Sequence, residues 1–121
     1  MVINSLHVAG ETYGDRQEKL RLLRYVLNNQ MPVAVSLRRE LGNCYDAHAI
    51  AIDAAIEGQV QNVGYVPAGI AIWLSDVMDG GVQVVADNPR IIGGYEGAPT
   101  LGLLIRISYP GPGTIPAQIT S

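Results

Sequence analysis

The hydrophobic and polar positions of this chain change period several times, and the changes predict short strands interrupted by two helices. A period of two is typical of a half-buried strand. It is clearest over 32–38, where Val33, Val35 and Leu37 share one side. Comparable runs predict further strands over 6–9, 49–54, 59–66, 82–86 and 100–109, with a short strand at 90–93 inside a glycine-rich loop over 87–99.

Two segments instead carry hydrophobic residues at helical spacing. The first follows Asp15, a good N-cap residue that forms a capping-box-like pair with Glu18. Its expected core face holds Leu20, Leu23, Val26 and Leu27, and its expected solvent face holds Gln17, Arg21 and Arg24. The second helix begins after Pro67 and ends at Gly80-Gly81, where glycine suits a left-handed C-terminal turn.

The resulting order, β-α-β-β-β-α-β-β, is not the regular alternation of a doubly wound fold. It predicts a mainly β domain of about six strands with two short helices, arranged as a small barrel or a strongly curved sheet. The expected domain covers residues 1–109. The remaining residues, 110–121, form a Pro/Gly-rich tail without a core-forming pattern.

Composition supports one globular domain. Of the 121 residues, 48% are hydrophobic and 16% are charged, the reverse of the balance in disordered chains. No segment has the roughly 18 consecutive apolar residues of a membrane span, and the first residues lack the pattern of a secretory signal. Cys44 is the only cysteine, which excludes an internal disulfide. We therefore expect a cytoplasmic protein without a membrane association.

Charge is divided unevenly along the chain. The net charge is −3, but residues 1–39 carry six basic and three acidic groups, whereas residues 40–121 carry two basic and eight acidic groups. A polyanion should therefore meet the N-terminal third first.

Candidate catalytic groups are sparse. His7 lies in a strand that we expect to be largely buried, and His48 lies close to Asp46 in sequence. An Asp46-oriented imidazole at His48 would suit a hydrolase, but no serine nearby has the context of an activated nucleophile. The histidines and Cys44 lack structural-zinc spacing, and no phosphate-binding glycine loop is present. We expect no cofactor, no metal and no enzymatic activity.

Four segments in order resemble the HIRAN domain family. The most specific block is Asn43-Cys44-Tyr45-Asp46-Ala47-His48-Ala49-Ile50, and a second matching block, Gly64-Tyr65-Val66-Pro67, follows it in the chain. Before them stands His7-Val8-Ala9-Gly10-Glu11-Thr12-Tyr13, followed by Arg16-Gln17-Glu18, and Val35-Ser36-Leu37-Arg38-Arg39-Glu40 leads into the first block. The helix 70–78 ending in Gly80-Gly81 completes the set. The resemblance covers roughly residues 5–108.

The resemblance implies an OB-like barrel that captures a single-stranded DNA 3′ end, in DNA repair, at a replication fork or in a mobile element. Tyr13, Tyr45 and Tyr65 match ring-bearing positions that contact the end nucleotides. Asp46 matches the carboxylate that accepts a hydrogen bond from the free 3′-hydroxyl. His48 stands where the family has asparagine, and is included as a candidate contact.

Two basic positions of the family are neutral in this chain, Thr12 and Ala68. Fewer cations mean weaker phosphate contacts and a shallower salt dependence. Three arginines are candidates to compensate: Arg16, which begins the first helix beside Tyr13, and Arg38 and Arg39, which precede the polar loop.

Other interpretations remain open from the residues alone. Tyr45 and Asp46 also suit a tight turn in which the aspartate binds backbone N–H groups and the tyrosine covers the core. The acidic C-terminal part and the Pro/Gly tail favour a protein-interaction or assembly module, with a helicase or nuclease encoded separately as a possible partner. A hydrolase based on His48 and Asp46 is a third alternative.

Overall fold

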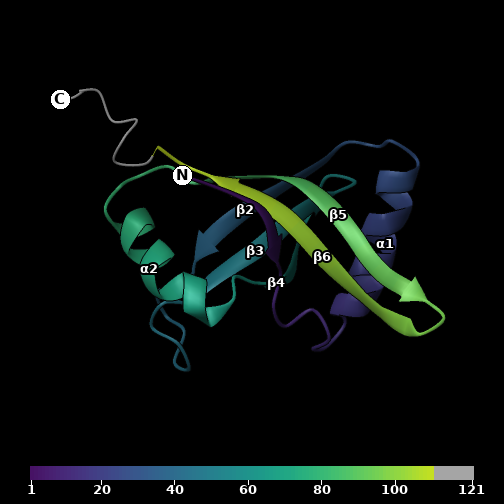
Figure 1. Cartoon of the computed structure of the whole chain (residues 1–121), viewed down its shortest axis with the longest axis horizontal. Helices are drawn as coiled ribbons and strands as arrows, with labels where there is room; N and C mark the ends of the chain where they lie inside the picture. The colour runs from purple at the N-terminus through teal and green to yellow at the C-terminus, as the bar shows by residue number, and fades with distance from the viewer. Residues whose placement is uncertain (111–121) are drawn as a thin grey trace.

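The computed structural model describes residues 1–110 and contains six strands and two helices (Figure 1). The mainly β class with two helices is confirmed. The tail expected at 110–121 lies, apart from Pro110, outside the described residues. The elements are β1 (Val2–His7), α1 (Arg16–Asn28), β2 (Val33–Arg39), β3 (Ile50–Ile56), β4 (Gln59–Tyr65), α2 (Ala68–Asp79), β5 (Val85–Tyr95) and β6 (Ala98–Ser108).

The strands form two antiparallel sheets of three, in the orders β1-β6-β5 and β2-β3-β4. They are small curved sheets and not a closed barrel. One isolated bridge joins them where the chain leaves β1: the N–H of Ala9 donates to the carbonyl of Tyr65 (2.8 Å), and the N–H of Tyr65 donates to the carbonyl of Ala9 (2.9 Å). This bridge brings the segment after β1 to the end of β4.

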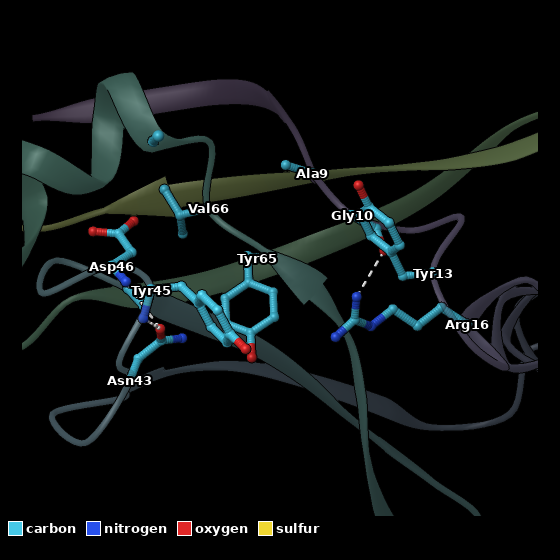
Figure 2. A pocket seen from close by; sticks show the side chains of 11 residues that line it. Ala9, Gly10, Tyr13, Arg16, Asn43, Tyr45, Asp46, Tyr65 and Val66 are labelled. Carbon is cyan, nitrogen blue, oxygen red and sulfur yellow. Dashed lines mark hydrogen bonds between the residues drawn. The ribbon is translucent and has the colours of Figure 1, made fainter.

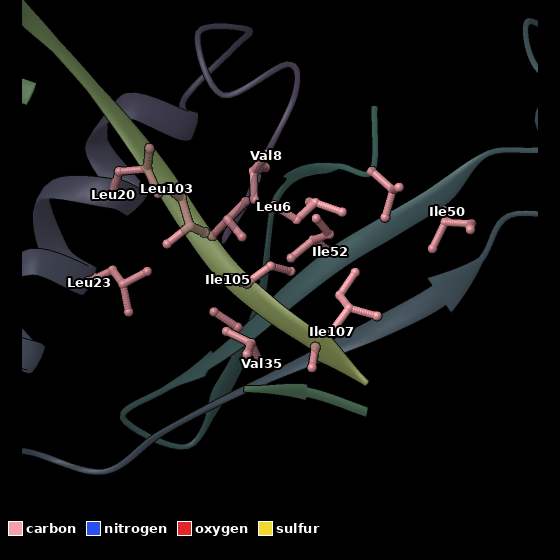
Figure 3. Close-up of a cluster of buried hydrophobic side chains, with 14 of the residues drawn as sticks. Leu6, Val8, Leu20, Leu23, Val35, Ile50, Ile52, Leu103, Ile105 and Ile107 are labelled. Atoms are coloured by element: carbon pink, nitrogen blue, oxygen red, sulfur yellow. The ribbon is translucent and has the colours of Figure 1, made fainter. Parts of the chain in front are cut away.

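The hydrophobic core lies between the two sheets and α1 (Figure 3). Ile50 and Ile52 of β3 are fully buried, as the sequence predicts, and so are Leu103 and Ile105 of β6. The helical stripe of α1 is confirmed, since Leu20, Leu23 and Val26 have no exposed surface.

The polar side of α1 departs from expectation. Asp15 is the N-cap residue, but its side chain makes no capping hydrogen bond. Its carboxylate instead lies 3.3 Å from Nζ of Lys19, so the capping box is wrong. Gln17 is not solvated either: its amide donates to the carbonyl of Leu101 and accepts from the N–H of Leu101, both at 2.9 Å. These bonds fasten the first turn of α1 to β6.

The first strand was predicted at 6–9 and instead spans Val2–His7. Its pairing with β6 is interrupted by a bulge between Ile3 and Leu6, so the residues before Leu6 lack the alternation that would have predicted the start of the strand. Within 6–9 the alternation holds: Leu6 and Val8 are buried, and the side chain of His7 between them is exposed (58%), not buried as expected.

The glycine-rich loop predicted at 87–99 is also wrong, although the short strand expected within it at 90–93 is confirmed as part of β5. This segment belongs to the long hairpin of β5 and β6. Asn88 (φ 52°) lies in a bulge between Asp87 and Arg90, and Gly93 (φ 76°) and Gly94 (φ 78°) adopt left-handed backbone near the second bulge. Residues that normally interrupt a strand therefore form bulges here, and β5 stays paired with β6 on both sides of them.

Helix α2 follows Pro67 and buries Ala71, Leu74 and Ser75. It ends as predicted, with Gly81 in a left-handed conformation (φ 90°). Among the described residues, no helix has the length and apolar character needed to cross a membrane.

Candidate functional site

A cleft of about 860 Å³ opens where three segments meet: the loop after β1, the loop between β2 and β3, and the junction of β4 with α2 (Figure 2). That volume lies within the range of ordinary ligand sites, about 300–1,000 Å³. Its wall holds five of the residues predicted from the sequence. They are Tyr13, Arg16, Tyr45, Asp46 and Tyr65.

The loop between β2 and β3 is shaped by Asn43. Its Oδ1 accepts from the backbone N–H of Tyr45 (2.8 Å) and of Asp46 (2.9 Å), a local turn built by an asparagine side chain. The turn projects the ring of Tyr45, which is 96% exposed. Tyr45 therefore does not cover the core, and this part of the tight-turn interpretation is wrong.

One carboxylate oxygen of Asp46 makes a structural hydrogen bond, and the other is free to contact a ligand. Its Oδ1 accepts from the backbone N–H of His48 at 2.8 Å, which agrees with the other part of the tight-turn interpretation. Within residues 1–110, Oδ2 accepts no hydrogen bond, and the residue is only partly buried beside Val66 on the cleft wall (Figure 2). One carboxylate oxygen thus remains available to a ligand.

Tyr65 stands at the end of β4 with its ring in the cleft and its hydroxyl bound behind it. The hydroxyl lies 2.8 Å from Oε1 and 2.9 Å from Oε2 of Glu40. Desolvation, and next the hydrogen bond to Glu40, raise the pKa of Tyr65, so the phenol stays neutral and donating. The guanidinium of Arg16 lies over the ring, 5.2 Å from its centroid, a cation–π contact.

Glu40 links the two tyrosine-bearing segments. Besides Tyr65, its carboxylate accepts from Nδ2 of Asn43 (3.0 Å) and lies 3.3 Å from Nη1 of Arg38. The hydrogen bond from Asn43 is the largest cause that lowers the pKa of Glu40, followed among the lowering causes by the bond from Tyr65 and the charge of Arg38. The carboxylate is therefore ionised at neutral pH.

The opposite wall of the cleft carries Tyr13 and Arg16 (Figure 2). Arg16 donates through Nη1 to the carbonyl of Gly10 (2.8 Å) and through Nε to Oδ1 of Asn62 (3.1 Å). Among the described residues it has no salt-bridge partner, so its charge is not neutralised. Tyr13 is 73% exposed. The cleft thus combines three aromatic rings, one free cation and one carboxylate.

A comparison with known families matches residues 6–101 to the HIRAN domain. This chain belongs to the HIRAN domain family. The match covers most of the 121 residues and includes every residue of the cleft wall. HIRAN is known as a DNA-binding domain. Neither the curated proteins nor the solved structures contain a match to the chain.

Two predicted contacts of this HIRAN domain do not line the cleft. Arg38 pairs with Asp53 (2.8 Å) and with Glu40, and the hydrogen bond to Asp53 is the largest cause that raises its pKa. His48 directs Nδ1 toward Oγ of Ser75 on α2, at 3.1 Å. The carboxylate of Asp46 binds the backbone of His48 and not its ring.

Sequence analysis assigned no functional contact to Glu40 or Asn43, although both lie in the segments that resemble the family. The sequence pattern indicates only a charged residue at the end of a strand for Glu40 and a loop residue for Asn43. The turn that Asn43 builds is local, but the role of Glu40 in this HIRAN domain depends on Tyr65, which lies 25 residues from Glu40 in the chain. No local pattern predicts a contact across that separation.

Proposed function

We propose that the cleft binds the 3′ end of single-stranded DNA, and that the domain acts by binding and not by catalysis. The observation that carries the proposal is the gathering of Tyr13, Tyr45 and Tyr65 around Asp46 and Arg16 in one cleft. Every base has a π-face, so aromatic rings hold unpaired bases with little sequence preference, at about 1–3 kcal/mol per base.

Asp46 would select the end of the strand. A carboxylate accepts a strong hydrogen bond from a hydroxyl but repels a phosphate. Its unoccupied oxygen therefore favours a free 3′-hydroxyl over a phosphorylated or continuing strand. Arg16 would supply a cation for a neighbouring phosphate.

Because the wall holds one free cation, we expect a Kd of about 1 μM or weaker at physiological salt. The position of His48 also favours binding over hydrolysis, since Ser75, the hydroxyl that its ring meets, is fully buried and out of reach of a substrate, and the carboxylate of Asp46 is engaged with backbone.

Calorimetric titration with short oligonucleotides tests the proposal. The 3′-hydroxyl form should bind more tightly than the 3′-phosphate form, and blunt duplex should bind least. Asp46→Asn retains an oxygen for the N–H of His48 but removes the charge, so it should reduce the preference for 3′-hydroxyl. Asp76→Asn, which removes an exposed carboxylate of α2 outside the cleft, is the matched control.

Equal binding of both 3′ forms by the unmodified protein would exclude the role of Asp46. Absence of binding to any oligonucleotide at low salt would reject DNA binding by this cleft and favour the assembly module.

A further inference from the structure

A second hollow, of about 310 Å³, lies where the hairpin of β5 and β6 ends. The register places it on the outer face of the sheet β1-β6-β5. Leu103 and Ile105 of β6 point to the core, so Gly102 between Leu101 and Leu103 faces outward. Ile92 pairs with Gly102, and it and Gly102 line the hollow.

The floor and wall of this hollow suit a flat ring. A Cβ on Gly102 would lie 3.0 Å from Nε2 of His7 and 3.0 Å from Cγ1 of Ile92, so the missing side chain creates the depth. Tyr95 borders the hollow with 66% of its surface exposed, and Ile92 is 39% exposed. An aromatic ring left this open has no packing role in the domain.

The polar edge of the hollow is formed by His7 and Glu11. Oε2 of Glu11 is buried and has no hydrogen-bond partner within residues 1–110. Nε2 of His7 is 3.9 Å away, just beyond hydrogen-bond distance. A carboxylate and an imidazole offer acceptors and donors to the edge of a base, whereas the carboxylate repels a phosphate.

The hollow and the cleft are neighbours along the chain. Gly10 lines the cleft and Glu11, the next residue, lines the hollow. In Figure 1 the loop after β1 lies between the end of the β5–β6 hairpin and the loop that joins β2 to β3. A strand that left the cleft across this loop would therefore be directed toward the hollow.

A free cation lies on the same outer face. Arg90 pairs with Leu104, which in turn pairs with His7, so the three form one row across the sheet. Arg90 donates to Oγ of Ser5 (3.1 Å) and to the carbonyls of Asn4 (2.5 Å) and Asn88 (3.2 Å), but forms no salt bridge within the described residues, so its charge is not neutralised. Its charge would attract a phosphate beside the hollow, which favours a nucleic acid over an apolar protein segment as occupant.

We propose that this hollow is a second base-binding site, which stacks an internal base of the same strand on Tyr95. The inference rests on the proposed function, because the cleft must hold the 3′ end for the strand to continue this way. It extends the contact along the strand toward its 5′ side.

Calorimetry with unlabelled oligothymidylates tests the inference. The unmodified protein should bind an oligomer of about eight nucleotides more tightly than one of two, within the site sizes of OB-like domains. Tyr95→Ala should weaken binding of the longer oligomer by about fivefold or more, the lower end of single-base stacking, and leave the shorter one unchanged. Tyr95→Trp should retain the affinity for the longer oligomer.

Tyr25→Ala is the matched control, since Tyr25 is 61% exposed on α1 and lines neither cavity. Equal loss in both alanine variants, or no loss in Tyr95→Ala, would overturn the second site and leave the hollow to a protein partner. In that case the shorter oligomer still binds, and the proposed function stands. Failure of both oligomers to bind the unmodified protein would reject both proposals.

Discussion

The hydroxyl of Tyr65 lies 2.8 Å from Oε1 of Glu40, and this contact joins the end of β4 to the end of β2 beneath the cleft. The same carboxylate accepts from Asn43, whose Oδ1 in turn orders the backbone of Tyr45 and Asp46. The partly buried carboxylate of Glu40 therefore positions the ring of Tyr65 directly, and the ring of Tyr45 through the loop that Asn43 orders.

Glu40→Gln should lower the free energy of unfolding at pH 7 by about 1.5–3 kcal/mol, as expected for hydrogen bonds to a charged group. The pKa of Glu40 is lowered from 4.5 in the folded protein. Its contribution is thus complete above pH 4.5 and is lost as the pH falls through the lower folded value. Urea unfolding at pH 7 and pH 3 should show a larger loss in the unmodified protein than in Glu40→Gln.

Glu57→Gln provides the control, because Glu57 is exposed in the turn between β3 and β4. If Glu40→Gln and the unmodified protein lose the same stability between the two pH values, the ionised carboxylate of Glu40 does not hold this network.

Tyr45→Ala should separate stability from binding. The ring is 96% exposed, so the free energy of unfolding should change by less than about 0.5 kcal/mol. Affinity for a single-stranded 3′ end should fall by about 1–3 kcal/mol, the contribution of one stacked base. Tyr45→Phe, which keeps the ring, should bind nearly as well. A loss of affinity in Tyr45→Phe as large as in Tyr45→Ala would assign the effect to the hydroxyl.

Ala68→Lys should restore a cation at the cleft. Ala68 is exposed on the cleft wall at the start of α2, where the family resemblance implies a basic residue. Binding of single-stranded DNA should tighten at low salt, and the slope of log K against log salt should steepen by about 0.7, the value for one phosphate contact. Titrations at several salt concentrations measure the slope. Ile72→Lys, on the exposed part of α2 outside the cleft, should change the slope less.

Gly64→Ala should destabilise the domain by about 1–3 kcal/mol or more. Gly64 has a φ of 153°, and a Cβ there would collide with Val8 and lie 2.7 Å from the carbonyl oxygen of Ala9. Gly64 lies beside the Ala9–Tyr65 bridge, so the strain would displace the segment after β1 from the end of β4, where the cleft is formed. Thermal unfolding measures the loss.

Gly69→Ala is the contrasting variant. Gly69 lies in α2 with no heavy atom within 4 Å of a built Cβ, so alanine should stabilise the helix by about 0.5–1 kcal/mol. If Gly64→Ala is as stable as the unmodified protein, the close approach of β4 to the segment after β1 is not required.

Elements with an uninterrupted period were predictable from sequence. The stripe of Leu20, Leu23 and Val26 and the alternation of Val33, Val35 and Leu37 both describe real helix and strand faces. Strand β6 and the middle of β5 were predicted, but the continuity of β5 was not, because Asn88 and the paired glycines 93 and 94 resemble loop residues. Only pairing with β6, which satisfies their neighbours' backbone groups, makes them part of a strand.

The candidate site shows the same division. Sequence analysis selected Tyr13, Tyr45, Tyr65 and Asp46 by resemblance and Arg16 as a compensating cation, and the structure places all of them on one cleft. It also selected Arg38 and His48, whose side chains engage Asp53 and Ser75 away from the cleft. Whether a polar side chain faces a ligand or a neighbour depends on which partners the sheets bring near it.

By itself, the sequence determined the mainly β class, both helices and the residue types of the site, because periodicity and family blocks are local properties of the chain. The tertiary structure alone decided which of those residues meet. The bridge between Ala9 and Tyr65 draws three distant segments together. The carboxylate of Glu40 then accepts hydrogen bonds both from Tyr65 and from Asn43 in the loop that carries Tyr45. A contact between segments so far apart in the chain produces no periodic pattern in the sequence.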